Sequence, residues 1–176
     1  MASIFTHSLV GGTLAYLAPA QLQNHPKAKW FYFLMIFLPI IPDFDYVGFV
    51  FRVPYNSFWG HRGFTHSILF AFICTTLLCF YLSYKKNLKP ISQVYLFLFL
   101  ALISHAVLDA MTNGGLGVAF YSPYTLTRYF FSWRPIQVSP LGMHFFSERG
   151  LVVLTSEFFW IWIPCLFLIF ARRLLK

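Results

Sequence analysis

Apolar residues along the chain gather into five runs separated by polar connections. The runs are Ile4–Ala20, Trp30–Ile41, Ser67–Tyr84, Ile91–Leu108 and Leu151–Ala171. A helix needs about 20 apolar residues to cross the hydrocarbon core of a bilayer. Only the last run reaches that length alone, and we expect Pro42 to end the second because proline cannot continue a helical hydrogen-bond ladder. The pattern predicts one all-α domain over residues 1–176, a polytopic integral membrane bundle of about five short spans.

The composition supports a membrane protein. Hydrophobic residues make up 59% of the chain and charged residues only 10%, against about 25% charged residues in an ordinary soluble domain. So few charges cannot cover the surface of a water-soluble protein of this size, and soluble and disordered chains are thereby excluded. Short spans imply a thinned bilayer or a protein-lined cavity on one side.

Basic residues occupy alternate connections, which must lie on the same side of the membrane. They are Lys27, Lys29, Lys85, Lys86, Lys89, Arg172, Arg173 and Lys176, and no acidic residue accompanies them. The positive-inside rule makes this side cytoplasmic. We therefore predict a multi-pass protein of the bacterial cytoplasmic (inner) membrane, with its N-terminus outside and its C-terminus in the cytoplasm. The net charge of +8 is interpreted as topology and contact with anionic lipid, and nucleic acid is not expected as a partner.

Seven residues of the types that bind metals fall at the opposite, periplasmic end of the predicted spans. They are His7, Asp43, Asp45, His61, His66, His105 and Asp109. Polar residues commonly gather at helix ends, but membrane interfaces favour Lys, Arg, Trp and Tyr rather than His and Asp. Ionisable groups near hydrocarbon cost several kcal/mol unless they are paired or coordinated. Four separate stretches of chain therefore predict a metal site at the extracytoplasmic end.

The local spacings fit metal binding, although each has an ordinary alternative. His105 and Asp109 are four residues apart and share a helix face. The alternative interpretation is a hydrogen-bonded pair that binds no metal. Asp43 and Asp45 repel each other unless a cation lies between them, which favours a metal site. The alternative is that they form a turn or a helix cap. The segment His61–Ser67 sets two imidazoles in a loop, which is also consistent with juxtamembrane polar residues.

The predicted donors are imidazoles and carboxylates without thiolates. This set suits zinc, manganese or iron, and its size allows one or two divalent ions. Two ions about 3.5–4 Å apart typically bind the attacking and leaving oxygens of a phosphoester displacement.

These motifs carry a resemblance that spans nearly the whole chain. The chain resembles the YdjM-like family of inner-membrane proteins in His7, Pro42–Asp45, His61–Ser67, Ser104–Asp109, Thr112–Gly115, Tyr121–Pro123, Phe131–Ile136 and Ser139–Leu141. The resemblance implies a metal-dependent hydrolase. The order of His and Asp residues is also remotely similar to zinc-dependent phospholipase C and P1-type nucleases, but the N-terminal Trp ligand and the second His-x-x-x-Asp/Glu segment are absent here.

The resulting hypothesis is a membrane metal-dependent hydrolase that cleaves a phosphoester of a lipid or other anionic substrate through a metal-activated water. Membrane lipid is then both environment and candidate substrate. His7, Asp45, His61, His105 and Asp109 are the expected primary ligands, Asp43 and His66 are further ligands or acid–base groups, and Arg62, with Arg128 and Arg134 as weaker candidates, binds the anion.

Three other functions fit the same residues. They are a non-catalytic metal- or haem-binding protein, an ion-coupled transporter, and an assembly protein whose cluster only holds helices together. The sequence leaves open the oligomeric state and the roles of His144, Glu148 and Glu157.

Overall fold

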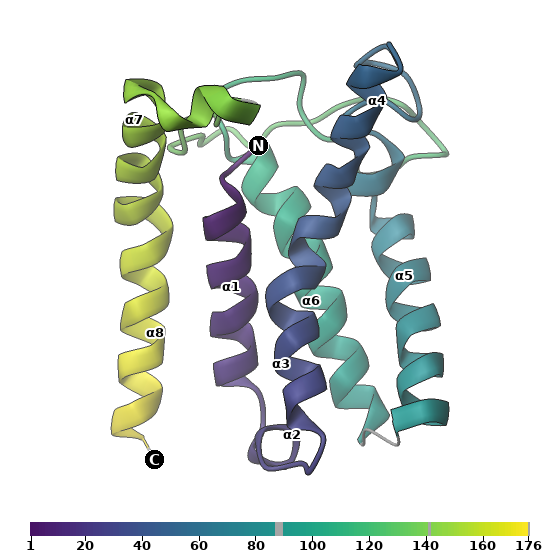
Figure 1. Ribbon diagram of the computed structural model, residues 1–176, viewed down its shortest axis with the longest axis vertical. Coiled ribbons are helices and arrows are strands. Elements are labelled where there is room, and N and C mark those ends of the chain that lie inside the picture. The colour runs from purple at the N-terminus through teal and green to yellow at the C-terminus, as the bar shows by residue number, and fades with distance from the viewer. Residues whose placement is uncertain (87–89, 141, 176) are drawn as a thin grey trace.

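The computed structural model describes residues 1–86, 90–140 and 142–175, and within these ranges the chain is helical with no strand (Figure 1). Lys89, Leu141 and Lys176, which entered the sequence argument, lie outside the described residues. The helices are α1 (Ile4–Leu17), α2 (Ala20–Gln23), α3 (Ala28–Phe37), η1 (Leu38–Tyr46), α4 (Val47–Val50), η2 (Phe64–His66), α5 (Ile68–Tyr81), η3 (Leu82–Lys86), α6 (Ile91–Ala110), η4 (Gly142–Phe146), α7 (Glu148–Glu157), η5 (Phe158–Trp162) and α8 (Ile163–Leu174). The predicted all-α bundle is therefore confirmed.

Four helical segments of the described chain are long and apolar enough to cross a membrane. They are Ala28–Val50, Ile68–Lys85, Ile91–Ala110 and Glu148–Leu174. The fifth, α1, has 14 residues and a length of about 21 Å at 1.5 Å per residue, which is less than the roughly 30 Å of a hydrocarbon core. The five predicted spans are therefore present as four helices of spanning length and one shorter apolar helix.

The sequence predicted that the second span ends at Pro42, but the structure shows that it does not. It continues through Pro42 as the 3₁₀ helix η1 and then as α4, ending at Val50. In a 3₁₀ helix each backbone carbonyl accepts a hydrogen bond from the N–H three residues later. A proline therefore removes one such hydrogen bond, and the helix continues in the same direction. Asp43 and Asp45 therefore project from a continuous helical segment rather than from a turn after it.

The short helix α1 lies at the centre of the bundle. It packs against α3, α6 and α8, while α5 packs against the far side of α6 (Figure 1). Gly11 permits the closest of these contacts, because a Cβ at this position would lie 1.8 Å from the carbonyl oxygen of Met35 in α3. The surrounding helices also bury polar α1 residues, including Thr6 and His7.

The two ends of the bundle differ in chemistry. The apolar core, which includes Phe31, Met35 and Leu98, fills the body of the bundle. Helix α2, the end of α5, the start of α6 and the C-terminal end of α8 lie at one end, and the start of α1, α4 and α7 lie at the other (Figure 1). The first end carries the described basic connections, and the second receives the predicted ligand residues.

Candidate metal centre

Four buried side chains converge where η1, η2 and α6 meet. Asp43, His66, His105 and Asp109 each offer one ligand atom, and these atoms all lie within 4.8 Å of one another. We call these residues the central group. All four side chains are buried, although they come from segments that are far apart in the sequence.

The central group has the spacing of a metal site. The two Nε2 atoms of His66 and His105 lie 2.9 Å apart. Asp43 Oδ1 lies 3.4 Å from His105 Nε2 and 3.7 Å from His66 Nε2. Asp109 Oδ2 lies 3.6 Å from His66 Nε2 and 3.8 Å from His105 Nε2. Donors about 2.0–2.1 Å from a tetrahedral zinc ion lie roughly 3.3 Å from each other, so the four atoms fit around one small cation.

The ring of His105 is held with its Nε2 lone pair toward this centre. Its Nδ1 lies 2.6 Å from the carbonyl oxygen of Pro39, which can only accept, so Nδ1–H donates and Nε2 carries no proton in the neutral ring. Pro39 has a carbonyl to offer because its 3₁₀ partner would be the N–H of residue 42, and Pro42 has none.

His66 is held in the same way by a carboxylate. Its Nδ1 lies 3.2 Å from Asp45 Oδ2, so Nδ1–H is directed to Asp45 and Nε2 to the central group. Burial opposes a charge on His66, but Asp109, Asp43 and Asp45 outweigh it and raise the pKa of this ring to about 10. The carboxylates thus favour a positive charge here, which a proton or a metal ion can supply.

Asp43 has the least satisfied side chain of the central group. Within the part of the chain that the structure describes, neither of its oxygens has a hydrogen-bond partner. A buried carboxylate in this condition costs several kcal/mol unless a cation accompanies it. This orphaned carboxylate, together with two imidazole lone pairs, fits a divalent metal.

A second group contains Asp45, His61 and His66, whose ligand atoms also lie within 4.8 Å of one another. Asp45 is well satisfied: His61 Nδ1 lies 2.6 Å from Oδ1, and Oδ2 accepts from the backbone N–H of Arg62 and the hydroxyl of Thr65. Burial lowers the pKa of His61, against the opposing effect of Asp45. We call these three residues the supporting group, because hydrogen bonds already hold Asp45 where it orients His66.

His7 lies beside the central group without joining either set. Its ring stacks on His105 with 3.9 Å between centroids, and its Nε2 lies 3.6 Å from Asp109 Oδ1. Both ring nitrogens of His7 are buried, and neither has a hydrogen-bond partner among the described residues. Asp109 Oδ1 also accepts a hydrogen bond from the backbone N–H of Ala2, which joins the start of the chain to α6.

Arg62, expected to bind an anionic substrate, is fully buried and occupied by protein groups. Its Nε lies 2.9 Å from Asp109 Oδ2, and its remaining nitrogens donate to the carbonyl of Gly114 and the hydroxyl of Thr112. Its φ of +62° is uncommon for a residue with a side chain and often marks functional sites. Three carboxylates, Asp43, Asp45 and Asp109, meet this guanidinium and the N-terminal ammonium, which lies 3.9 Å from Asp109 Oδ1, so with neutral imidazoles negative charge remains in excess.

The other basic candidates lie away from the central group. Arg128 donates to the carbonyls of His61 and Tyr55 and so stabilises the loop before η2. Arg134 is exposed, with its guanidinium 4.8 Å from the centre of the Phe130 ring.

The three residues left open by the sequence have different surroundings. His144 and Glu148 are exposed and belong to neither group. Glu157 is fully buried and accepts hydrogen bonds from Ser3 and Thr6 at the start of α1. It therefore fastens the segment that carries His7. Sequence reasoning placed Glu157 inside a span but contained no signal for these partners.

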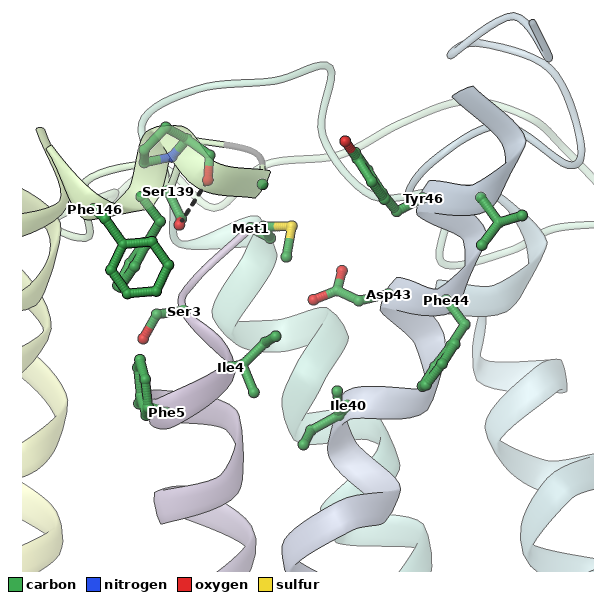
Figure 2. A pocket seen from close by; sticks show the side chains of 14 residues that line it. Met1, Ser3, Ile4, Phe5, Ile40, Asp43, Phe44, Tyr46, Ser139 and Phe146 are labelled. Carbon is green, nitrogen blue, oxygen red and sulfur yellow. Dashed lines mark hydrogen bonds between the residues drawn. The ribbon is translucent and has the colours of Figure 1, made fainter. Parts of the chain in front are cut away.

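An apolar cavity of about 510 Å³ lies next to Asp43. Its walls come from the start of α1, from η1 and α4, and from η4 (Figure 2). Figure 2 shows the Asp43 carboxylate projecting from η1 toward the start of α1, between Met1 and Ile40. The central group therefore has a neighbouring space in which a ligand can lie.

Comparison with known proteins agrees with the resemblance seen in the sequence. A sequence model of the YdjM inner membrane protein family matches residues 1–176. The chain belongs to this family. This family member is also similar to "Inner membrane protein YbcI" of Escherichia coli (strain K12), with 38% identity over 133 residues, which are 75% of this chain and 76% of that protein.

Family membership and the apolar helices make this chain a multi-pass inner membrane protein. No solved structure matches the chain. The remote similarity to zinc-dependent phospholipase C and P1-type nucleases receives no support from these comparisons.

Proposed function

We propose that this family member is a metal-dependent hydrolase that cleaves a phosphoester of a lipid or other anionic substrate at the periplasmic face of the inner membrane. The observation that carries the proposal is the central group, in which two imidazole lone pairs and two carboxylates meet beside a cavity. A site that only joined helices would not need a space for a ligand beside an unsatisfied carboxylate.

Asp43, His66, His105 and Asp109 would hold the ion, with zinc favoured by the donor set and manganese or iron as alternatives. When bound, a divalent ion lowers the pKa of a water toward about 7 and stabilises negative charge on the attacked group. Asp45 and the Pro39 carbonyl hold the two imidazoles in the ligating tautomer.

The chain's own groups supply the remaining roles. Asp43 Oδ2 has no hydrogen-bond partner and can accept a proton from the attacking water. The water oxygen would form the new bond to phosphorus while the phosphorus–oxygen bond to the alcohol breaks, and the alcohol oxygen takes up a proton. Arg62 holds Asp109 in place through its Nε rather than contacting substrate.

The orientation is part of the proposal. The described basic connections lie at the end of the bundle opposite to the central group (Figure 1), and the positive-inside rule assigns that end to the cytoplasm. A fluorescent protein fused to the C-terminus should then be fluorescent, and alkaline phosphatase fused there should be inactive. The reverse result would move the site to the cytoplasmic face.

The function is tested with purified full-length protein. We expect elemental analysis to find a divalent metal, and hydrolysis of phosphoester substrates to depend on it. His105→Ala should lose both metal and turnover, whereas His25→Ala, the same change at the opposite end of the bundle, should lose neither. Metal without turnover on phosphoesters, acyl esters or amides would favour the non-catalytic alternative, and a Soret band would indicate haem. Metal ions accumulated in sealed vesicles would favour a transporter.

A further inference from the structure

The cavity beside Asp43 is almost entirely apolar. Ile4 and Phe5 of α1 form one wall and Ile40 and Phe44 of η1 another, and Phe145 and Phe146 of η4 also line the cavity. Asp43 is the one acidic group among the described residues that line it. A ligand that fills such a cavity is apolar along most of its length and has a polar end at Asp43.

The cavity is continuous with the apolar surface of the bundle. Phe5 and Phe44 line it and are 57% and 69% exposed, so the cavity is open between α1 and η1. Both helices belong to the apolar part of the bundle, and Ile40 and Phe44 lie inside a segment able to span the membrane. A chain that enters between them therefore passes from hydrocarbon to a protein wall of similar polarity.

This continuity decides between a soluble and a membrane-borne ligand. A polar ligand from water would meet apolar walls that cannot replace its hydrogen bonds, and it would pay the desolvation cost. A lipid tail gives up no hydrogen bonds and leaves surroundings as apolar as leucine. The volume of about 510 Å³ is also within the usual range of ligand sites, roughly 300–1,000 Å³.

We propose that this cavity binds an acyl chain of a membrane glycerophospholipid and thereby brings the lipid's phosphoester to Asp43. The inference deepens the proposed function by naming its substrate class, and it rests on that function only for the bond that is cleaved. Binding of the chain is a separate property that can be measured without turnover.

The test uses the full-length protein in nanodiscs that contain phosphatidylcholine with a diazirine in the acyl chain. After irradiation, mass spectrometry locates the labelled residues. We expect label on cavity residues such as Ile4 and Ile40 in excess of label on Leu77 and Phe80, which face lipid on α5 with exposed fractions of 65% and 75%. Equal labelling of both regions would indicate ordinary boundary lipid and would overturn the proposal.

A variant that fills the cavity provides the second comparison. Ile40→Trp should remove the excess label from the cavity, whereas Ile73→Trp, the same change on the lipid-facing side of α5, should leave it unchanged. Unchanged metal content shows that the variant is folded, and if Ile40→Trp does not fold, Ile4→Trp fills the cavity from the opposite wall. Excess label that persists in the folded variant would refute the inference.

The two proposals fail in different ways. His105→Ala should lose metal and turnover while the cavity label remains. Cavity label in a wild-type protein that hydrolyses nothing would support the proposed lipid site and refute the proposed hydrolase activity. Turnover without any cavity label would support the proposed hydrolase activity and refute the proposed lipid site.

Discussion

The central and supporting groups share His66 but differ in how well the protein satisfies them. In the supporting group, Asp45 accepts hydrogen bonds at both oxygens, from a backbone N–H, a hydroxyl and an imidazole. In the central group, Asp43 has no hydrogen-bond partner among the described residues, and two imidazole nitrogens face each other at 2.9 Å. Identical residue types therefore serve two purposes, one completed within the protein and one that calls for a cation.

This difference predicts a hierarchy of effects. Changes in the central group should remove the metal, while changes in the supporting group should weaken its binding through the orientation of His66.

Asp109→Ala should cause the largest loss. The change removes a ligand and also leaves the buried guanidinium of Arg62 without its partner at 2.9 Å, which typically costs about 3–5 kcal/mol. Denaturant unfolding in detergent and elemental analysis measure the two effects. Glu148→Ala, at an exposed carboxylate of the same end, should change stability by less than about 0.5 kcal/mol. Similar losses in the two variants would contradict the assignment.

Asp43→Asn should separate metal binding from folding. The amide has nearly the same shape, and no hydrogen bond to Asp43 is lost, so the apo protein should still fold and lose only the attraction between this carboxylate and the His66 ring. Metal affinity should fall by more than the roughly 100-fold typical of residues that only orient ligands. Competition with a chelator of known affinity measures the change, and wild-type affinity would show that Asp43 is not a ligand.

Asp45→Asn should weaken metal binding without abolishing it. The amide can no longer accept at both ends, so the hold on His66 Nδ1 is impaired and affinity should fall about 10–100-fold. The same competition assay gives the comparison with Asp43→Asn. A loss equal to or greater than that of Asp43→Asn would mean that Asp45 itself binds an ion and that the supporting group is a second metal site.

Thr65→Val should produce the smallest effect. It removes one hydroxyl donated to Asp45 at 2.7 Å and should reduce the free energy of unfolding by about 1 kcal/mol. Metal affinity should change less than in Asp45→Asn. Thr76→Val, which removes an exposed hydroxyl bond within α5, is the matched control. A metal loss as large as that of Asp45→Asn would give Thr65 a larger role than orientation.

The sequence predicted at which end of the bundle the site lies better than it predicted which ligand atoms contact one another. Apolar runs and basic connections were enough to bring seven His and Asp residues to one end, because helix direction in a membrane is set by hydrophobicity and charge. Which ring nitrogen faces which oxygen depends on tertiary contacts, such as the one between His105 and Pro39, that no spacing encodes. For this reason the expected ranking of ligands, with Asp43 and His66 as secondary, differs from the central group that the structure forms.

Two local results show where sequence rules were insufficient. Pro42 was read as a helix end, but a 3₁₀ segment accommodates it. Arg62 was interpreted as a substrate-binding cation, since an arginine between histidines suggests an anion, yet its guanidinium is buried against Asp109. In both cases the residue type was informative, and only the three-dimensional partner decided its role.

Pro42 also affects the orientation of a histidine on a neighbouring helix. By withholding an amide hydrogen, it leaves the oxygen of Pro39 open to the ring of His105. An ordinary residue at position 42 would offer that oxygen a second donor and weaken its hydrogen bond to the ring. A residue outside the central group thus strengthens the hydrogen bond that fixes the tautomer of a histidine on α6.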